Sequence, residues 1–374
     1  MKDRESEKGL FAASAMYLLA AVGLVLFAAG SPYLSLFLSR RFRGISQEGL
    51  TLIVNVLYYG FFLFLPIANW TSGRADTVEW LRLNPISLGA TIRTVLIAVL
   101  SVAAAYNLTM VWTALWQSAG LNVTSDSYIR PTSTAELVRS VISVAVVAGI
   151  SEELLFRGVL LTAWENRGPR KAAWITAILF AMLHGSLLGL PAEIMCGLIL
   201  AVLVRWTNSL YAGMIFHSAY NAALTLINYV STDPALGEAT SEAVSLFQAM
   251  GGARGAVSLL LEAALIGMLI GALLNRFRIL YLLRDRAMQA MGRAAALRLR
   301  QRALQARLYG EEPSEDEAEI GKIFQLRNPD GSARSTAGAT PIHSEPLSIG
   351  VLLLIFAGAV TTLALYALDV LSML

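Results

Sequence analysis

The sequence predicts an all-α protein, a polytopic transmembrane helical bundle of about eight or nine spans. Only 15% of its 374 residues are charged, where a soluble globular domain has about 25%. The charges are also unevenly placed, because residues 9–275 carry 27 of them while the shorter segment 276–345 carries 21. A soluble protein could not cover its surface with so few charged side chains, so the solvent for most of this chain is lipid.

Apolar stretches of about 20 residues, the length that crosses a hydrocarbon core of roughly 30 Å, recur along the chain. The first apolar run extends to Ser39 and contains Gly30-Ser31-Pro32. This run is too long for one helix and too short for two, so we expect a kink or an interfacial piece after the break. The predicted spans lie near residues 10–30, 50–70, 94–117, 139–163, 172–188, 190–206, 209–229, 256–275 and 348–368.

The cytoplasmic side of the bundle is predicted from the arginines that follow the eighth span. Between Arg276 and Arg307 the chain has nine arginines and one acidic residue, Asp285. Basic residues near span ends stay in the cytoplasm. By alternation, the acidic loop with Asp233 and Glu242 is then expected outside. We expect the arginines to hold their segment near anionic lipid; docking of a protein partner is the alternative.

The fourth predicted span contains the ionisable motif Glu152-Glu153-Leu154-Leu155-Phe156-Arg157. Charged groups inside a span are expensive and ask for an explanation. Glu153 and Arg157 are four residues apart on one helix face, so they can form an ion pair. Glu152 points about 100° away and is free to face a cavity, which suits a general acid or base. The alternative is a buried ion pair that only holds helices together.

Two of the three histidines also fall in predicted spans. His184 ends the fifth span, and His217 lies in the seventh with Asn221 one turn further on, whereas His343 lies in a polar linker. A lone membrane histidine is more often an interhelical hydrogen bonder than a catalyst. Together with Glu152, however, these residues allow two chemistries. Either Glu and His activate water while His and Asn stabilise an oxyanion, or Glu and His ligate a divalent metal whose bound water attacks.

The motifs Glu152-Glu153-x-x-x-Arg157, Phe180-x-x-x-His184 and His217-x-x-x-Asn221 occur in this order, each on a predicted span. In this they resemble the three motifs of the CPBP family, which comprises the CAAX prenyl endopeptidases and bacteriocin-processing intramembrane proteases. The resemblance covers roughly residues 136–230. It implies that Glu152 activates water with help from His184, and that His217 and Asn221 stabilise the oxyanion. Glu153 and Arg157 would be supporting residues.

The resemblance also bears on cofactors. The family is commonly described as metalloproteases, yet a metal-free glutamate mechanism agrees better with its architecture, so no cofactor is expected. If zinc were present, Glu152, His184 and His217 would be its ligands. The chain contains no H-E-x-x-H signature, and its single cysteine, Cys196, excludes a cysteine-based metal cluster.

The resemblance and the composition together give a domain plan. Transmembrane helices in 1–135 precede the CPBP-like catalytic core, 136–230, and the eighth span, 231–275. A cytoplasmic Arg-rich helix and acidic linker follow in 276–346, and an extra span in 347–374.

The predicted function is that of an intramembrane endopeptidase. It would cleave a peptide bond near the C-terminus of a membrane-associated protein or peptide precursor. The alternatives are a non-proteolytic scaffold or immunity-type membrane protein, and a proton-coupled transporter, against which the lack of inverted repeats argues. The Ala- and Arg-rich composition is typical of a GC-rich bacterium. It favours the inner membrane and a sorting tail or peptide precursor over a prenylated substrate. Membrane lipid is an expected partner and nucleic acid is not.

Overall fold

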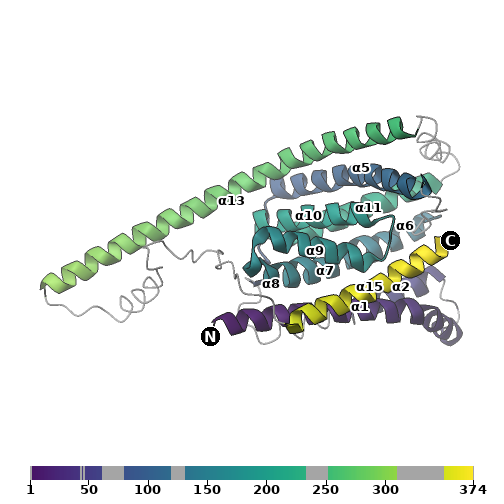
Figure 1. Cartoon of the computed structure of the whole chain (residues 1–374), viewed down its shortest axis with the longest axis horizontal. Coiled ribbons are helices and arrows are strands. Elements are labelled where there is room, and N and C mark those ends of the chain that lie inside the picture. Colours follow the sequence, from purple (N-terminus) through teal and green to yellow (C-terminus); the bar gives the residue numbers. More distant parts are fainter. Residues whose placement is uncertain are drawn as a thin grey trace. The chain divides into compact units, whose positions relative to one another are not determined.

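The computed structural model describes residues 2–42, 44, 47–60, 80–118, 131–232, 252–309 and 349–373. Within these ranges every regular element is a helix (Figure 1), so the all-α prediction is confirmed for the described chain. The helices outside residues 134–167 are α1 (Lys2–Arg41), α2 (Gln47–Tyr58), α5 (Leu88–Ser118), α9 (Pro169–His184), α10 (Leu190–Thr207), α11 (Leu210–Thr232), α13 (Ala253–Tyr309) and α15 (Ile349–Met373).

Helices long and apolar enough to cross a membrane are present, as expected of an integral membrane protein. Four helices in the described chain meet this criterion, and Gly350–Leu363 is a shorter apolar helix. The larger number of eight or nine spans stays a prediction. The four candidate spans are Gly9–Arg41, Leu88–Trp116, Leu190–Thr207 and Arg254–Gly292.

The segment with the acidic motif is helical throughout, but its winding changes along its length. It begins as α6 (Thr134–Ser140), widens to the π-helix η2 (Val141–Val147) and returns to α-helix in α7 (Ala148–Glu153). A second π-helix, η3 (Leu154–Leu161), leads into the short elements α8 (Thr162–Trp164) and η4 (Glu165–Arg167). The catalytic carboxyl candidates therefore lie in one and a half turns of α-helix between two π segments, a winding that often marks functional sites.

Local sequence signals explain where these helices begin and end. The Ser133 side chain accepts a hydrogen bond from the Glu136 backbone N–H and caps α6. Gly168 and Pro169 separate η4 from α9, with the proline in the first turn, where its missing N–H costs nothing. Gly185, with a φ of 64°, ends α9 directly after His184. The prediction that this span continues to residue 188 is therefore wrong, because the left-handed glycine stops the helix four residues earlier.

Two expectations about long helices are also corrected. The first apolar run does not break at Pro32; α1 is one helix of 40 residues, about 60 Å long. The eighth predicted span and the Arg-rich segment are likewise one helix, α13, of 57 residues. Contacts divide the chain into one unit of residues 1–274 and 344–374 and a second of residues 275–343. The acidic run Glu311–Glu319 and His343 lie outside the described residues.

The core of the first unit surrounds the segment that carries Glu152 and Glu153. The helix pairs α9–α10, α5–α11 and α1–α15 pack side by side (Figure 1), and α7 and η2 lie against α11. Phe156 of η3 is fully buried and meets Tyr17 of α1 and Phe180 of α9 edge-on, with ring centroids 6.3 and 5.1 Å apart. This aromatic contact holds η3 between the N-terminal helix and the helix that carries His184.

Candidate active site

A buried ion pair lies beside the site. Arg157 and Glu153 are fully buried, and a guanidinium nitrogen donates to Glu153 Oε1 at 2.5 Å, as their spacing predicts. A second guanidinium nitrogen donates to the Gly197 carbonyl of α10 at 3.1 Å, and the Arg157 guanidinium carbon lies 4.5 Å from the centroid of the Phe180 ring. Carboxylate, carbonyl and ring face together replace the water that the guanidinium loses.

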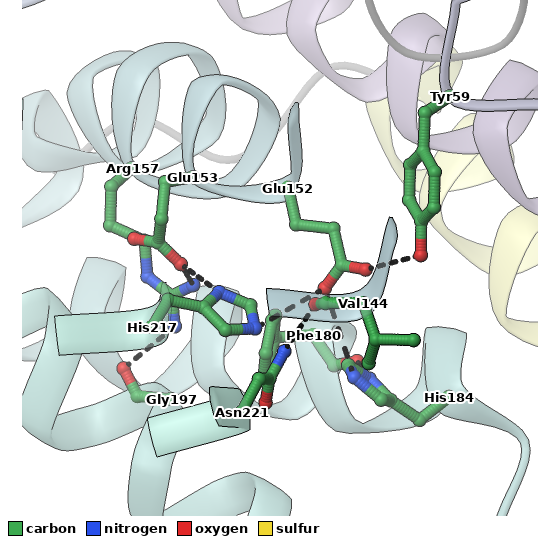
Figure 2. A network of polar contacts seen from close by, with 10 residues as sticks. All are labelled: Tyr59, Val144, Glu152, Glu153, Arg157, Phe180, His184, Gly197, His217 and Asn221. Atoms are coloured by element: carbon green, nitrogen blue, oxygen red, sulfur yellow. Dashed lines mark hydrogen bonds and ion pairs between the residues drawn. The ribbon is translucent and has the colours of Figure 1, made fainter. Parts of the chain in front are cut away.

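His217 is held by the same carboxylate. Its Nδ1 lies 3.0 Å from Glu153 Oε1, and its side chain is 5% exposed. Because the carboxylate paired with Arg157 can only accept, Nδ1 is the donor. The ring is thereby oriented with Nε2 toward Glu152 Oε2, at 3.9 Å (Figure 2).

His184 approaches the same oxygen from α9. Its Nδ1 lies 2.9 Å from the Phe180 carbonyl oxygen, an acceptor, so this nitrogen carries the hydrogen. Its Nε2 lies 3.8 Å from Glu152 Oε2. The two histidines therefore present their Nε2 atoms to one carboxylate oxygen from two different helices (Figure 2).

The two oxygens of Glu152 have different surroundings. Oε1 accepts a hydrogen bond of 3.2 Å from the Tyr59 hydroxyl. Oε2 is buried and has no hydrogen-bond partner among the described residues. The separations of 3.8 and 3.9 Å to the histidine Nε2 atoms are too long for direct hydrogen bonds but suit one water or substrate atom that contacts all three groups.

Asn221 lies one turn after His217, on the side of the site nearest η2. Its amide nitrogen donates to the Val144 carbonyl at 2.9 Å. This bond uses one of the two amide hydrogens, leaves the other available to a substrate, and fixes the amide beside the Glu152 carboxyl group (Figure 2).

Exposure falls steadily across the cluster. The side chains of His184, Glu152 and His217 are 32%, 11% and 5% exposed, and the ion pair behind them is fully buried. The site therefore opens at His184 and is dry at its far end. Electrostatic interactions are stronger in such buried surroundings than in water, because the effective dielectric constant is lower.

Glycines on three helices allow this close approach. A Cβ on Gly213 of α11 would lie 2.8 Å from Glu153 Oε2, and one on Gly149 of α7 would lie 2.8 Å from Ser218 Oγ. At Gly197 it would lie 2.8 Å from the Ala177 Cα atom. Each of these positions lets a neighbouring helix or carboxylate lie where any larger residue would force a shift.

The structure brings together all six residues that the sequence singled out: Glu152, Glu153, Arg157, His184, His217 and Asn221. Tyr59 was not predicted from the sequence, because a tyrosine 93 residues away carries no motif that links it to Glu152. The paired aromatics Tyr58-Tyr59 inside a predicted span were the only available signal. Cys196 is buried, as expected of a packing residue.

The donor types around Glu152 Oε2 match those that zinc prefers, but the separations do not. Two ligand atoms of a tetrahedral zinc are about 3.3 Å apart, whereas the Glu152 oxygen lies 3.8 and 3.9 Å from the two nitrogens. Among the residues that the structure describes, no three His, Cys, Asp or Glu side chains are arranged to hold a metal ion. The cluster as it stands therefore does not fit a metal without movement of its side chains.

Comparison with known proteins agrees with the motif resemblance. Residues 134–223 match the family described as type II CAAX prenyl endopeptidase, Rce1-like. No curated protein and no solved structure gives a significant match. The matched segment begins at α6 and ends two residues after Asn221, so it contains all six of these residues.

Proposed function

We propose that the chain, whose residues 134–223 match the Rce1-like type II CAAX prenyl endopeptidase family, is an intramembrane endopeptidase in which Glu152 activates water. The substrate would be a membrane-associated protein or peptide precursor, cut near its C-terminus. The observation that carries this proposal is the buried, unpartnered Glu152 Oε2, which faces the Nε2 atoms of His184 and His217 at 3.8 and 3.9 Å.

In the first step Glu152 Oε2 takes a proton from a water molecule, whose oxygen bonds to the carbonyl carbon of the scissile peptide. His184 orients this water, because its Nδ1 hydrogen is committed to the Phe180 carbonyl and its Nε2 lone pair can accept the second water hydrogen. A water held in this way attacks at high effective concentration.

The carbonyl oxygen then carries negative charge, which His217 and Asn221 stabilise. His217 donates from Nε2 as an imidazolium whose positive charge offsets that of the oxyanion, while its Nδ1 donates to Glu153. Asn221 donates the amide hydrogen that the Val144 carbonyl does not use. When the intermediate collapses, the C–N bond breaks and the proton passes from Glu152 to the leaving amine, which restores the carboxylate.

The test uses the purified full-length protein in detergent. It is incubated with a peptide library in water enriched in ¹⁸O, together with matched prenylated and unprenylated peptides. Cleavage should place one ¹⁸O atom in each new C-terminal carboxylate, since water attacks directly. The variants Glu152→Gln, His184→Ala and His217→Ala should each lose cleavage by about 10²-fold or more while remaining monodisperse. Full activity in Glu152→Gln would contradict the mechanism.

The proposed reaction needs no metal. Treatment with 1,10-phenanthroline should leave the rate unchanged, and elemental analysis of the active protein should find less than stoichiometric zinc. Stoichiometric zinc, with activity lost on its removal and regained on its return, would instead make Glu152, His184 and His217 its ligands.

A further inference from the structure

The hydroxyl of Tyr59 contacts the proposed general base from outside the matched segment. Tyr59 directly follows α2 and donates to Glu152 Oε1 at 3.2 Å. The Tyr59 ring packs edge-on against the Tyr58 ring, with centroids 5.0 Å apart. Tyr58 in turn packs on Phe27 of α1, with ring centroids at 4.7 Å. A row of three aromatic rings thus connects the N-terminal helices to the carboxylate.

We propose that Tyr59 is a positioning residue for the reaction: it holds one oxygen of Glu152, so that the other oxygen faces the water and the two histidines. This inference rests on the proposed function. It adds a seventh side chain to the six already described, and this one lies outside residues 134–223.

The two oxygens of Glu152 differ in what they contact: Oε1 accepts from Tyr59, and Oε2 has no hydrogen-bond partner among the described residues. A glutamate side chain has three rotatable bonds, and its carboxylate can turn to bring either oxygen forward. An unheld carboxylate beside an imidazolium would turn to form a direct, charge-assisted hydrogen bond. That bond would close the separations of 3.8 and 3.9 Å that now leave room for a reacting atom. The Tyr59 hydrogen bond opposes this collapse.

Several groups near Glu152 are committed to other acceptors. The Arg157 guanidinium donates to Glu153 and to the Gly197 carbonyl. His184 donates to a backbone carbonyl, and the Asn221 amide donates to Val144. The Tyr59 hydroxyl supplies Glu152 with a hydrogen bond that these groups do not (Figure 2).

The first experiment compares Tyr59→Phe with the wild type on a cleaved peptide. A hydrogen bond to a charged group is worth about 1.5 to 3 kcal/mol, so kcat should fall about 10- to 100-fold. KM should stay unchanged, because the tyrosine acts on the base and not on the substrate. Replacing Tyr59 with 4-aminophenylalanine, which keeps a donor at the same position, should restore most of kcat.

Tyr17→Phe is the matched control, since Tyr17 is a buried tyrosine of α1 that packs on Phe156 instead of the site. It should keep the wild-type kcat. A Tyr59→Phe variant with unchanged kcat, or one whose loss 4-aminophenylalanine does not restore, would overturn the proposal.

A second readout does not depend on catalysis. Dicyclohexylcarbodiimide attacks protonated carboxyl groups in apolar surroundings, and peptide mapping locates the adduct. Loss of the Tyr59 hydrogen bond leaves Glu152 Oε1 uncovered, so labelling of Glu152 should be faster in Tyr59→Phe than in the wild type or Tyr17→Phe. Equal labelling rates would overturn the positioning role. If the wild type cleaves nothing but the labelling rates differ, the proposed function fails while the contact stands.

Discussion

At the scale of single residues, the site depends on one buried cation. Arg157 neutralises Glu153, and Glu153 in turn orients His217. Burying two charges is expensive, and a paired buried arrangement gives little net stability by itself. The main role of the pair is therefore to fix the Glu153 carboxylate that orients His217, and its contribution to stability is secondary.

We predict that Arg157→Leu costs about 3 to 5 kcal/mol of stability, because it leaves Glu153 buried without its counter-charge. The double variant Glu153→Gln with Arg157→Leu should recover part of this loss, since glutamine is neutral and can still accept from His217. Thermal unfolding in detergent, followed by loss of monodispersity, measures both. A double variant less stable than Arg157→Leu would show that the two residues do not act as a pair.

At the scale of helices, glycines determine how closely neighbouring helices approach one another around the site. Gly197 lets α10 approach α9 so closely that an added Cβ would lie 2.8 Å from the Ala177 Cα atom. The same glycine presents its carbonyl to Arg157. Gly197 therefore serves both the packing of α9 on α10 and the anchoring of the buried Arg157.

Gly197→Ala should separate α9 from α10 and cost about 1 to 3 kcal/mol, because the clash is with backbone and not with a flexible side chain. Activity should fall as well, since the shift moves the carbonyl that holds Arg157. Gly89→Ala of α5 is the matched control: nothing lies within 4 Å of an added Cβ there, and alanine favours helix. A Gly197→Ala variant as stable and active as Gly89→Ala would contradict this account.

Much of the helical plan was predictable from the sequence, because long apolar runs with few charges have few other structures open to them. The errors arose at positions where a single residue determines whether a helix continues or ends. Pro32 predicted a break, yet α1 continues through it, since a membrane helix can tolerate a proline when neighbouring groups satisfy the freed backbone. Gly185 was not recognised as a helix stop, although its position directly after His184 fixes that side chain at the helix end.

The site was predictable only in its chemistry. The spacing of Glu153 and Arg157 predicted an ion pair, and the structure contains it. The π winding on both sides of α7 changes the helical period over a few residues and leaves no clear trace in the sequence. The contacts of Glu152 with Tyr59 and of Asn221 with Val144 join residues far apart in the chain, so no local pattern predicts them. The catalytic roles themselves stay predictions.

At the scale of the whole molecule, the orientation in the membrane is the main open prediction. The arginines after Arg276 favour a cytoplasmic position, and the acidic loop before α13 an external one. One candidate span, Arg254–Gly292, begins after the loop and includes the first of these arginines. The side chains beyond Gly292 and the loop itself lie outside the described part of the chain.

Single cysteines test this orientation, and the chain suits the method because Cys196 is its only cysteine. In a Cys196→Ser background, Ser241→Cys should react with a membrane-impermeant maleimide on intact spheroplasts. Ala294→Cys should react only after the membrane is permeabilised. Reaction of both cysteines from the same side would mean that α13 does not cross the membrane, and reversed reactivity would mean that the positive-inside assignment is wrong.

The fall in exposure from His184 to the buried ion pair has a consequence for inhibitor design. An inhibitor must enter past His184 and end at Glu152, whose free oxygen is flanked by the two histidines. A peptide in which a hydrated ketone replaces the scissile carbonyl would place a tetrahedral carbon there, with one hydroxyl toward Glu152 Oε2 and the other toward His217 and Asn221. Mimics of this kind bind about 10²-fold or more tightly than substrates, and substituents that distinguish one protease from another belong next to His184, whose side chain is 32% exposed.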